Sequence, residues 1–220
     1  MTAPALTLTK LEHASVVLAS DRARILVDPG NLGTPNDPGA FDAILLTHHH
    51  PDHAAPEFLR DALAAGVDVY GPADAGEELG LAGADRGGAH WHPVEAGETF
   101  SVGDVPVVVA GSIHAEIHPD VPGPQNRAFL VGDGVFVTGD EHPLPPAPAS
   151  VLVTPMNAPW LAAPALVRYV RRVRPRLVLG VHEGFLNPAG LRVADRLLGM
   201  LTAEGADAAR RLEVGEEISL

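Results

Sequence analysis

The stretch Thr47-His48-His49-His50-Pro51-Asp52-His53 constrains the fold of this chain more than any other part of the sequence. It contains the pattern H-x-H-x-D-H, which supplies the imidazole nitrogens and carboxylate oxygens that zinc-type metals bind. The four members of this pattern are His48, His50, Asp52 and His53. The apolar residues 43–46 before it are typical of a short buried strand, and residues 54–65 after it are typical of a helix. The sequence therefore predicts a metal site in a strand-to-helix turn, where the backbone is fixed at both ends.

Four more residues of metal-binding type follow apolar segments elsewhere in the chain. They are Asp28 after residues 25–27, His114 just beyond residues 105–110, Asp140 just beyond residues 135–137 and His182 after residues 177–181. If these segments are strands that run in one direction within their sheets, their carboxyl ends converge on one place. Together with the histidine stretch, they predict one site assembled from five distant parts of the sequence.

The order of the remaining elements favours two mixed sheets packed face to face, with helices outside both. Further helices are expected over residues 73–82, over residues 161–173 and from an N-cap at Asn187 to about residue 203. Residues 114–125 and 141–149 are rich in proline and are expected to be loops on the side of the site. No linker divides the chain, so residues 1–220 are expected to form a single domain.

These five motifs resemble those of the metallo-β-lactamase superfamily, from about residue 7 to the end of the chain. The opening Glu12-His13-Ala14-Ser15 and the closing residues 212–217 are similar to the ascorbate-phosphate lactonase branch and to phospholipase-D-like metallo-hydrolases. The resemblance implies an α+β fold, the four-layer αβ/βα sandwich of two mixed β-sheets flanked by helices. It also implies a metal-dependent hydrolase.

The resemblance further implies two metal ions per chain. His48, His50 and His114 would hold one ion, Asp52, His53 and His182 the second, and Asp140 would bridge them. Zn2+ is the expected ion, and ligands with only nitrogen and oxygen atoms also permit Mn2+ or Fe2+. Two cations about 3.5–4 Å apart acidify a shared water, so a bridging hydroxide is available as the nucleophile at neutral pH. Asp52 is also a candidate catalytic residue, because with one ion bound it could hold the attacking water instead.

Several other residues have alternative interpretations. Asp28 matches a family position that supports the histidine turn, although a plain turn residue beside Pro29 is the alternative. His118 competes with His114 as the third histidine ligand; His114 is favoured because it is nearer to the preceding strand, and His118 would then line the pocket. His13 and His142 are candidates to face the substrate, and a buried structural histidine is the alternative for His13.

The charge and composition of the chain limit the kinds of partner that it can bind. The net charge of −13 repels phosphate backbones and anionic lipids, so neither nucleic-acid binding nor electrostatic membrane docking is expected. There is no cysteine, which excludes disulfides and thiolate zinc ligands. The first ten residues show no signal peptide, and no segment has the length of a transmembrane helix, so a cytoplasmic protein without a membrane anchor is expected.

The expected activity is hydrolysis of a small ester, lactone or phosphodiester. One alternative is a metal-bound scaffold without activity, against which the intact ligand set weighs. Another is a di-iron redox protein, which is disfavoured because di-iron flavoprotein relatives have a glutamate where this chain has His50. The sequence gives no signal for an oligomeric state.

Overall fold

Short runs of β-branched and other apolar residues build the sheets of this protein. The computed structural model describes residues 4–83 and 90–220. Strand β8 (Val105–Ala110) alternates between buried and more exposed positions, as a strand with one covered face does. Strand β4 (Ala43–Leu45) is buried at every position, because both faces of its sheet are covered.

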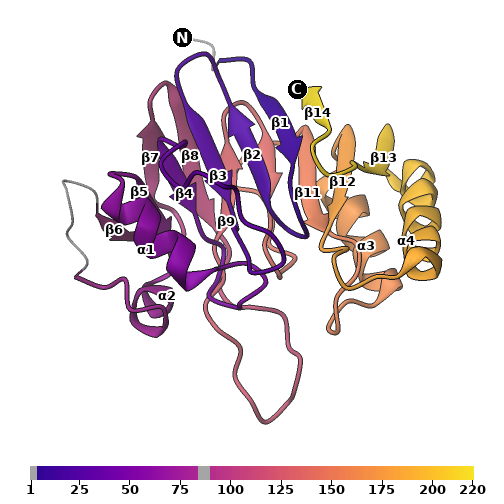
Figure 1. Cartoon of the computed structure of the whole chain (residues 1–220). Coiled ribbons are helices and arrows are strands. Elements are labelled where there is room, and N and C mark those ends of the chain that lie inside the picture. The colour runs from indigo at the N-terminus through magenta and orange to yellow at the C-terminus, as the bar shows by residue number, and fades with distance from the viewer. Residues whose placement is uncertain (1–3, 84–89) are drawn as a thin grey trace.

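The first sheet contains seven strands in the order β14-β1-β2-β3-β4-β5-β6 (Figure 1). Besides β4, these strands are β14 (Glu217–Ser219), β1 (Thr7–Lys10), β2 (Val16–Ala19), β3 (Arg24–Val27), β5 (Asp68–Gly71) and β6 (Trp91–Pro93). Strands β14, β1, β2 and β3 pair antiparallel, whereas β3 to β6 pair parallel. The sheet is therefore mixed.

The second sheet also contains seven strands, in the order β13-β12-β11-β10-β9-β8-β7. Besides β8, these strands are β13 (Ala208–Arg211), β12 (Leu177–Val181), β11 (Val151–Pro155), β10 (Val135–Val137), β9 (Ala128–Val131) and β7 (Thr99–Val102). Strands β7 to β10 pair antiparallel and β10 to β13 pair parallel. The two sheets thus repeat one arrangement of antiparallel and parallel strands.

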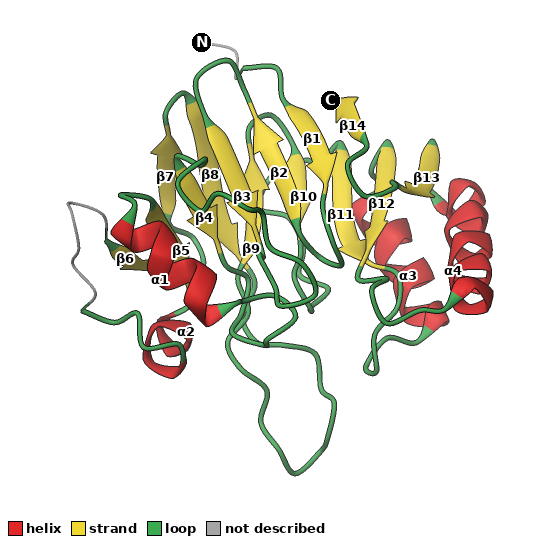
Figure 2. Cartoon of the chain, viewed as in Figure 1, coloured by secondary structure: helices red, strands yellow, loops and turns green. Residues whose placement is uncertain are grey.

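Helices cover the outer face of each sheet, as Figure 2 shows. The helices are α1 (Pro56–Ala64), α2 (Ala73–Glu78), α3 (Ala163–Val173), α4 (Pro188–Met200) and the 3-10 helix η1 (Leu201–Glu204). Helix α1 buries Phe58 and Leu59 against Ile44 and Val69 of the first sheet, and α3 buries Leu166 against the second sheet. The four-layer sandwich predicted from the sequence is confirmed. Among the described residues, no helix combines the length and apolar character needed to cross a membrane.

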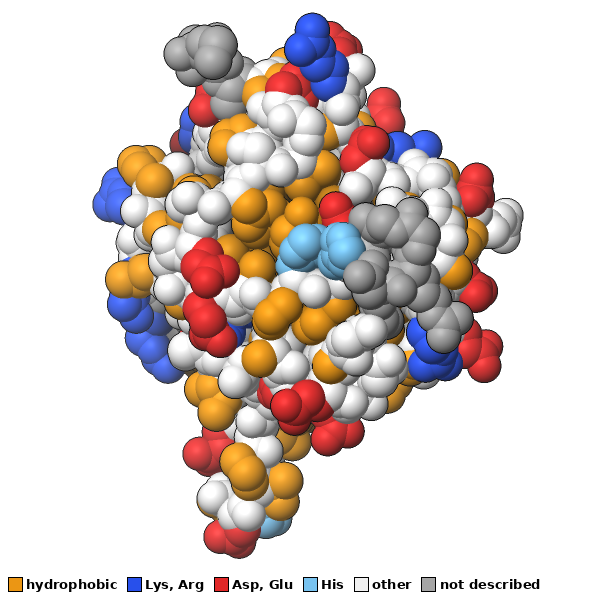
Figure 3. All heavy atoms as spheres, turned by 90° about the vertical axis from the view of Figure 1, so that its left-hand side faces the viewer, with side chains coloured by type: hydrophobic (Ala, Val, Ile, Leu, Met, Phe, Trp, Pro, Cys, Tyr) orange, Lys and Arg blue, Asp and Glu red, His pale blue; other side chains and the backbone are white. Residues whose placement is uncertain are grey.

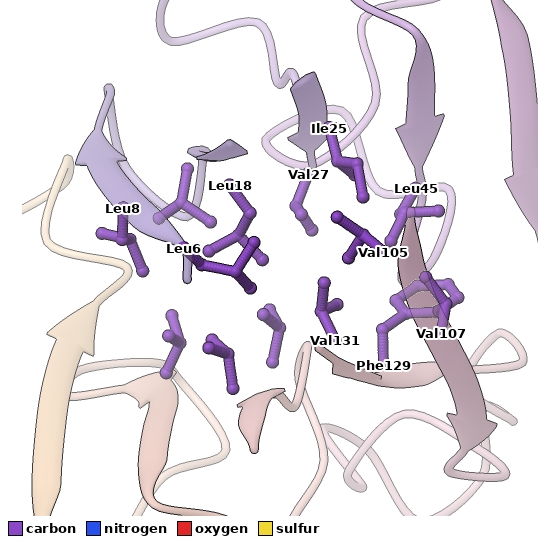
Figure 4. Close-up of a cluster of buried hydrophobic side chains, with 14 of the residues drawn as sticks. Leu6, Leu8, Leu18, Ile25, Val27, Leu45, Val105, Val107, Phe129 and Val131 are labelled. Atoms are coloured by element: carbon purple, nitrogen blue, oxygen red, sulfur yellow. The ribbon is translucent and has the colours of Figure 1, made fainter. Parts of the chain in front are cut away.

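The sheets pack on each other through a core of aliphatic side chains (Figure 4). Leu18, Ile25 and Val27 of the first sheet meet Val107 and Phe129 of the second, all within one buried cluster. Each such side chain contributes roughly 1.5–3 kcal/mol when it leaves water. This shared core fixes how the two sheets lie relative to each other, and with them the loops at their edges.

We expect Phe129→Ala to lower the free energy of unfolding by about 3–5 kcal/mol, because Phe129 is 0% exposed and a cavity would remain in the core. Urea denaturation measures the effect. Phe185→Ala is the matched control: Phe185 is 63% exposed, so its loss should stay within about 0.5 kcal/mol. Equal losses in the two variants would contradict this placement of the core.

The ends of several elements differ from the prediction. Helix α2 ends at Glu78 and not at residue 82, because Gly80 has φ of 66°, a left-handed conformation outside the helical region. Helix α4 begins as predicted, with the Asn187 side chain accepting hydrogen bonds from the amides of Ala189 and Gly190. Strands β13 and β14 were not predicted, since β13 reads Ala-Ala-Arg-Arg and β14 is only three residues long.

The strand directions bring five carboxyl ends to one edge of the sandwich. Strand β3 is parallel to β4; β8 is parallel to β10, since both are antiparallel to β9, and β12 is parallel to β10 through β11. The loops that follow these strands gather at the lower edge in Figure 1, where the long loop between β8 and β9 projects from the body. These five loops carry the predicted site residues.

Candidate metal centre

The structure brings the predicted ligands together in three overlapping groups, and within each group the potential ligand atoms lie within 4.8 Å of one another. One group is His48, His50 and His114; another is His13, Asp52, His53 and His182; the third is His48, His53 and Asp140. All seven residues predicted as metal ligands belong to these groups. His13 joins them, whereas His118 and His142 do not.

Asp140 lies at the centre of the cluster. Its Oδ2 atom is 3.3 Å from Nε2 of both His114 and His182, and its Oδ1 atom is 3.4 Å from Nε2 of His53. Two further residues hold it in place. The Asn126 side chain accepts a hydrogen bond from the Asp140 amide at 3.1 Å, and Nε1 of Trp160 donates to Oδ2 at 3.0 Å. The carboxylate is thus fixed between His114 of the first group and His53 and His182 of the second.

Asp28 and Thr47 orient the histidines that follow β4. Asp28 accepts hydrogen bonds from the Thr47 amide at 2.8 Å, from the Thr47 hydroxyl at 2.7 Å and from Nδ1 of His53 at 2.8 Å. Because the Thr47 hydroxyl donates to Asp28, its oxygen accepts from Nδ1 of His48 at 3.0 Å. When neutral, His48 and His53 therefore carry their protons on Nδ1. This leaves Nε2 of both rings unprotonated and able to bind a metal, with that of His48 lying 3.0 Å from Nδ1 of His50.

The structure separates His114 from His118. Nδ1 of His114 donates to the Ala115 carbonyl at 2.6 Å, so Nε2 is the nitrogen that faces Asp140. His118 is exposed, and its Nδ1 accepts a hydrogen bond from the Asp120 amide at 3.1 Å. His118 lines a hollow beside His50 and takes no part in the three groups.

His13 contacts Asp52 and is almost closed to solvent, with 1% exposed. Its Nδ1 accepts a hydrogen bond from the Gly184 amide at 2.9 Å, so the neutral ring carries its proton on Nε2. Nε2 in turn lies 3.1 Å from Oδ2 of Asp52 and donates to it. Burial lowers the pKa of His13 to about 4, which keeps the ring neutral. Its burial agrees with the alternative interpretation of His13 as a structural histidine, and its hydrogen bond orients Asp52.

His142 packs between aromatic side chains. Its ring is stacked on Tyr169, with centroids 4.4 Å apart, and it meets the edge of Trp160 at 5.3 Å. Burial lowers its pKa to about 4.

Sequence reasoning missed Trp160 and Asn126, the two residues that hold Asp140. Neither residue belongs to a metal-ligand pattern in the sequence. The orienting role of Thr47 could have been predicted, because Thr47 directly precedes the histidines.

Burial and the neighbouring carboxylates shift the pKa values of the histidines in this cluster in opposite directions. Burial lowers the pKa of His50 to about 4 and that of His48 well below its usual value. Burial also opposes protonation of His182, but the carboxylates of Asp140 and Asp52 raise its pKa to about 10. For Asp52, burial would raise the pKa, yet the hydrogen bond from His13 and the nearby imidazole of His182, 3.5 Å away, hold it far below its usual range. Asp52 is therefore ionised at any neutral pH.

The chemistry of the cluster fits a bound metal. Several of its buried polar atoms have no hydrogen-bond partner: His53 Nε2, His114 Nε2, both ring nitrogens of His182 and Asp140 Oδ1. Buried polar atoms are normally paired, because leaving one unpaired costs free energy. Here Nε2 of His53, His114 and His182 lies 3.3–3.4 Å from the Asp140 carboxylate, as ligand atoms around a shared cation do. Imidazole and carboxylate ligands suit zinc, manganese or iron.

Comparison with known proteins gives a consistent result. A family model described as "Beta-lactamase superfamily domain" matches residues 7–182. Protein Rv0786c of Mycobacterium tuberculosis is 31% identical over 192 residues, which cover 82% of this chain and 85% of that protein. A UPF0173 metal-dependent hydrolase of Myxococcus xanthus is 29% identical over 196 residues, which cover 78% of this chain and 68% of that protein.

Solved structures share the fold at lower identity. The metallo-beta-lactamase fold protein YhfI of Bacillus subtilis is 18% identical with a TM-score of 0.74, and the match covers 99% of this chain and 100% of that one. CmlA, a diiron beta-hydroxylase of Streptomyces venezuelae, is 19% identical with a TM-score of 0.69, and the match covers 100% of this chain and 54% of CmlA. At these identities the likeness concerns the fold alone.

Proposed function

Because this chain belongs to the beta-lactamase superfamily and is a metal-dependent hydrolase within it, we propose that it binds two metal ions and hydrolyses a small ester, lactone or phosphodiester. Zinc is the expected ion. The observation that carries the proposal is the position of Asp140, whose two oxygens face histidines from both ligand groups at 3.3–3.4 Å. A carboxylate in that position suits a bridge between two cations, since its negative charge reduces their repulsion.

The proposed ligands divide into two sets that share this carboxylate. His48, His50 and His114 would hold the first ion, Asp52, His53 and His182 would hold the second, and Asp140 would contribute to both. Asp28 supports the assignment, because its hydrogen bond to His53 Nδ1 directs Nε2 inward and raises the basicity of the ring. His13 gives Asp52 the same kind of support through its Nε2–H.

When bound, the two cations would supply a water acidified enough to react as hydroxide at neutral pH, and would polarise the group under attack. For an ester, the water's hydroxyl group adds to the carbonyl carbon, the bond from that carbon to the alcohol oxygen breaks, and the alcohol leaves with the remaining proton. Asp52 is ionised and accepts a hydrogen bond from His13, so its carboxylate is positioned to orient groups in the site.

Two alternatives make different predictions for the same measurements. A di-iron redox protein would contain iron and react with oxygen, and a scaffold would bind metal without turnover. Elemental analysis of the purified protein, followed by a screen of esters, lactones and phosphodiesters, separates them. We expect two ions per chain and turnover of at least one substrate class. A fully loaded preparation with one ion per chain, or two ions without any hydrolysis, would overturn the proposal.

We expect His114→Ala and His118→Ala to have different effects on metal content. His114→Ala should lose one of the two ions, because Nε2 of His114 faces the cluster. His118→Ala should keep both ions, because its ring is exposed and outside the ligand groups. Elemental analysis after dialysis against buffered zinc measures both. Metal loss in the His118 variant alone would reassign the ligand.

A further inference from the structure

Apolar side chains gather around the mouth of the metal centre. Among the described residues, nine large hydrophobic side chains are exposed. Six of them lie in the loops that follow β3, β8, β10 and β12, which also deliver Asp28, His114, Asp140 and His182. The six are Leu32, Ile113, Ile117, Val121, Leu144 and Phe185. Single exposed hydrophobic residues need no explanation, but six of nine in the loops around one site point to a ligand there.

On one side of the centre, two of these side chains line a hollow that borders the cluster at His50. The hollow has a volume of about 250 Å³, and its walls include His50, Ile117 and Val121. Figure 3 shows hydrophobic side chains on the projecting loop at the bottom of the molecule. Pockets for drug-sized ligands measure roughly 300–1,000 Å³, so this hollow suits one small apolar group beside the reacting atoms.

Apolar groups also lie on the opposite side. The ring of Phe185 stands 5.0 Å from that of His13 and 6.5 Å from that of His182. Leu32 lies close to the same place, because a Cβ added to Gly184 would meet both Leu32 and His13 at under 3 Å. The centre is therefore flanked by hydrophobic side chains on the sides of both proposed ions.

The same loops offer no cationic side chain. Residues 28–42, 46–55, 111–126, 138–150 and 182–187 contain no lysine or arginine, although they contain nine aspartates and glutamates. Two nearby cations are occupied elsewhere. Lys10 is buried and pairs with Glu183 at 2.8 Å, and Arg127 is buried with its Nε bonded to the Val94 carbonyl. Phosphate groups are recognised mainly through arginine and lysine, so apart from the proposed metal ions an anionic substrate would meet no lysine or arginine in these loops.

Resting on the proposed hydrolase function, we propose that the substrate is an uncharged carboxylic ester or lactone with an apolar group, and that Ile117 and Val121 bind this group in the hollow beside His50. A phosphodiester is the disfavoured class. The loop between β8 and β9 thus determines specificity, while the cluster beneath it carries out the hydrolysis.

The test uses the zinc-loaded protein with 4-nitrophenyl acetate, butyrate and hexanoate, and with bis(4-nitrophenyl) phosphate. We expect kcat/KM to rise about three- to fourfold for each methylene added until the hollow is full, and the phosphodiester to be the poorest substrate. Equal kcat/KM for all three esters, or faster turnover of the phosphodiester, would overturn the proposal. If no compound is hydrolysed by protein that holds two ions, the proposed function itself fails, which is a distinguishable result.

Matched variants locate the effect. Val121→Ala should lower kcat/KM for the hexanoate by about three- to tenfold relative to the acetate. Val193→Ala is the control, because Val193 is 72% exposed on α4 and Val121 is 62% exposed on the loop. Ile117→Lys should weaken hexanoate turnover and improve that of the phosphodiester. If Val121→Ala changes the molecular mass in light scattering but not the chain-length dependence, the loop is a contact between copies of the chain and the proposal is wrong.

Discussion

Asp140→Asn should reduce kcat/KM by more than about a hundredfold and lower the affinity for both metal ions. Substituting outer-shell partners of a metal typically costs 10- to 100-fold, and Asp140 lies within the ligand cluster itself. The amide keeps the shape of the carboxylate but loses the negative charge that faces His53, His114 and His182. Steady-state kinetics and competition with a zinc chelator measure the two effects.

Asp133→Ala is the control for loss of an acidic residue. Asp133 is exposed in the turn between β9 and β10, seven residues before Asp140, so activity and metal content should be unchanged. If Asp140→Asn lost one ion and kept the affinity for the other, Asp140 would belong to a single site. If it kept both ions and full turnover, it would have no role as a ligand.

The affinity for the second ion should rise about tenfold per pH unit between pH 7 and 8.5. The pKa of His182 is raised to about 10 in the metal-free protein, because the carboxylates of Asp140 and Asp52 outweigh the opposing effect of burial. His182 is then protonated across this range and must lose its proton before it binds metal. A histidine of ordinary pKa, near 6.5, would be mostly neutral there, and the affinity would be nearly flat.

The same shift makes the metal-free fold depend on pH. Since the folded pKa of His182 exceeds its unfolded value, the stabilisation is complete below about pH 6.5 and is lost as the pH rises through about 10. Titration with zinc buffers measures the affinity. His182→Ala is the comparison, because it should keep only the first ion, whose affinity does not depend on deprotonation of His182 and should lack this steep rise. A flat profile in the unsubstituted protein would contradict the protonation of His182.

The fold and most of the cluster could be predicted because their signals are local. Asp28 and His182 directly follow strands, and His48, His114 and Asp140 lie three or four residues beyond one. The direction of parallel strands then places these residues at one edge. His114 could be preferred over His118 for the same reason, its distance from the end of β8. Element centres were found more reliably than their ends, as α2 illustrates.

What could not be predicted depends on contacts between distant segments. Trp160 reaches Asp140 from the loop after β11, twenty residues along the chain, and no periodicity marks it. The role of His13 depends on the Gly184 amide, 171 residues away. Strand β13 is short and contains two arginines, so its sequence does not indicate a strand. It forms because its residues pair with the edge of β12. Such features become visible only once the two sheets are placed together.

The division of the cluster between the sheets has a consequence for how the protein matures. The loop after β4 in the first half of the chain carries His48, His50, Asp52 and His53, whereas His114, Asp140 and His182 come from the second. On the proposed ligand sets, neither ion can be fully bound by the half that is synthesised first. Metal capture is then a late event that follows docking of the halves. Once bound, the ions would connect the two halves of the chain and stabilise their packing, so only a chain whose halves have docked can bind both ions.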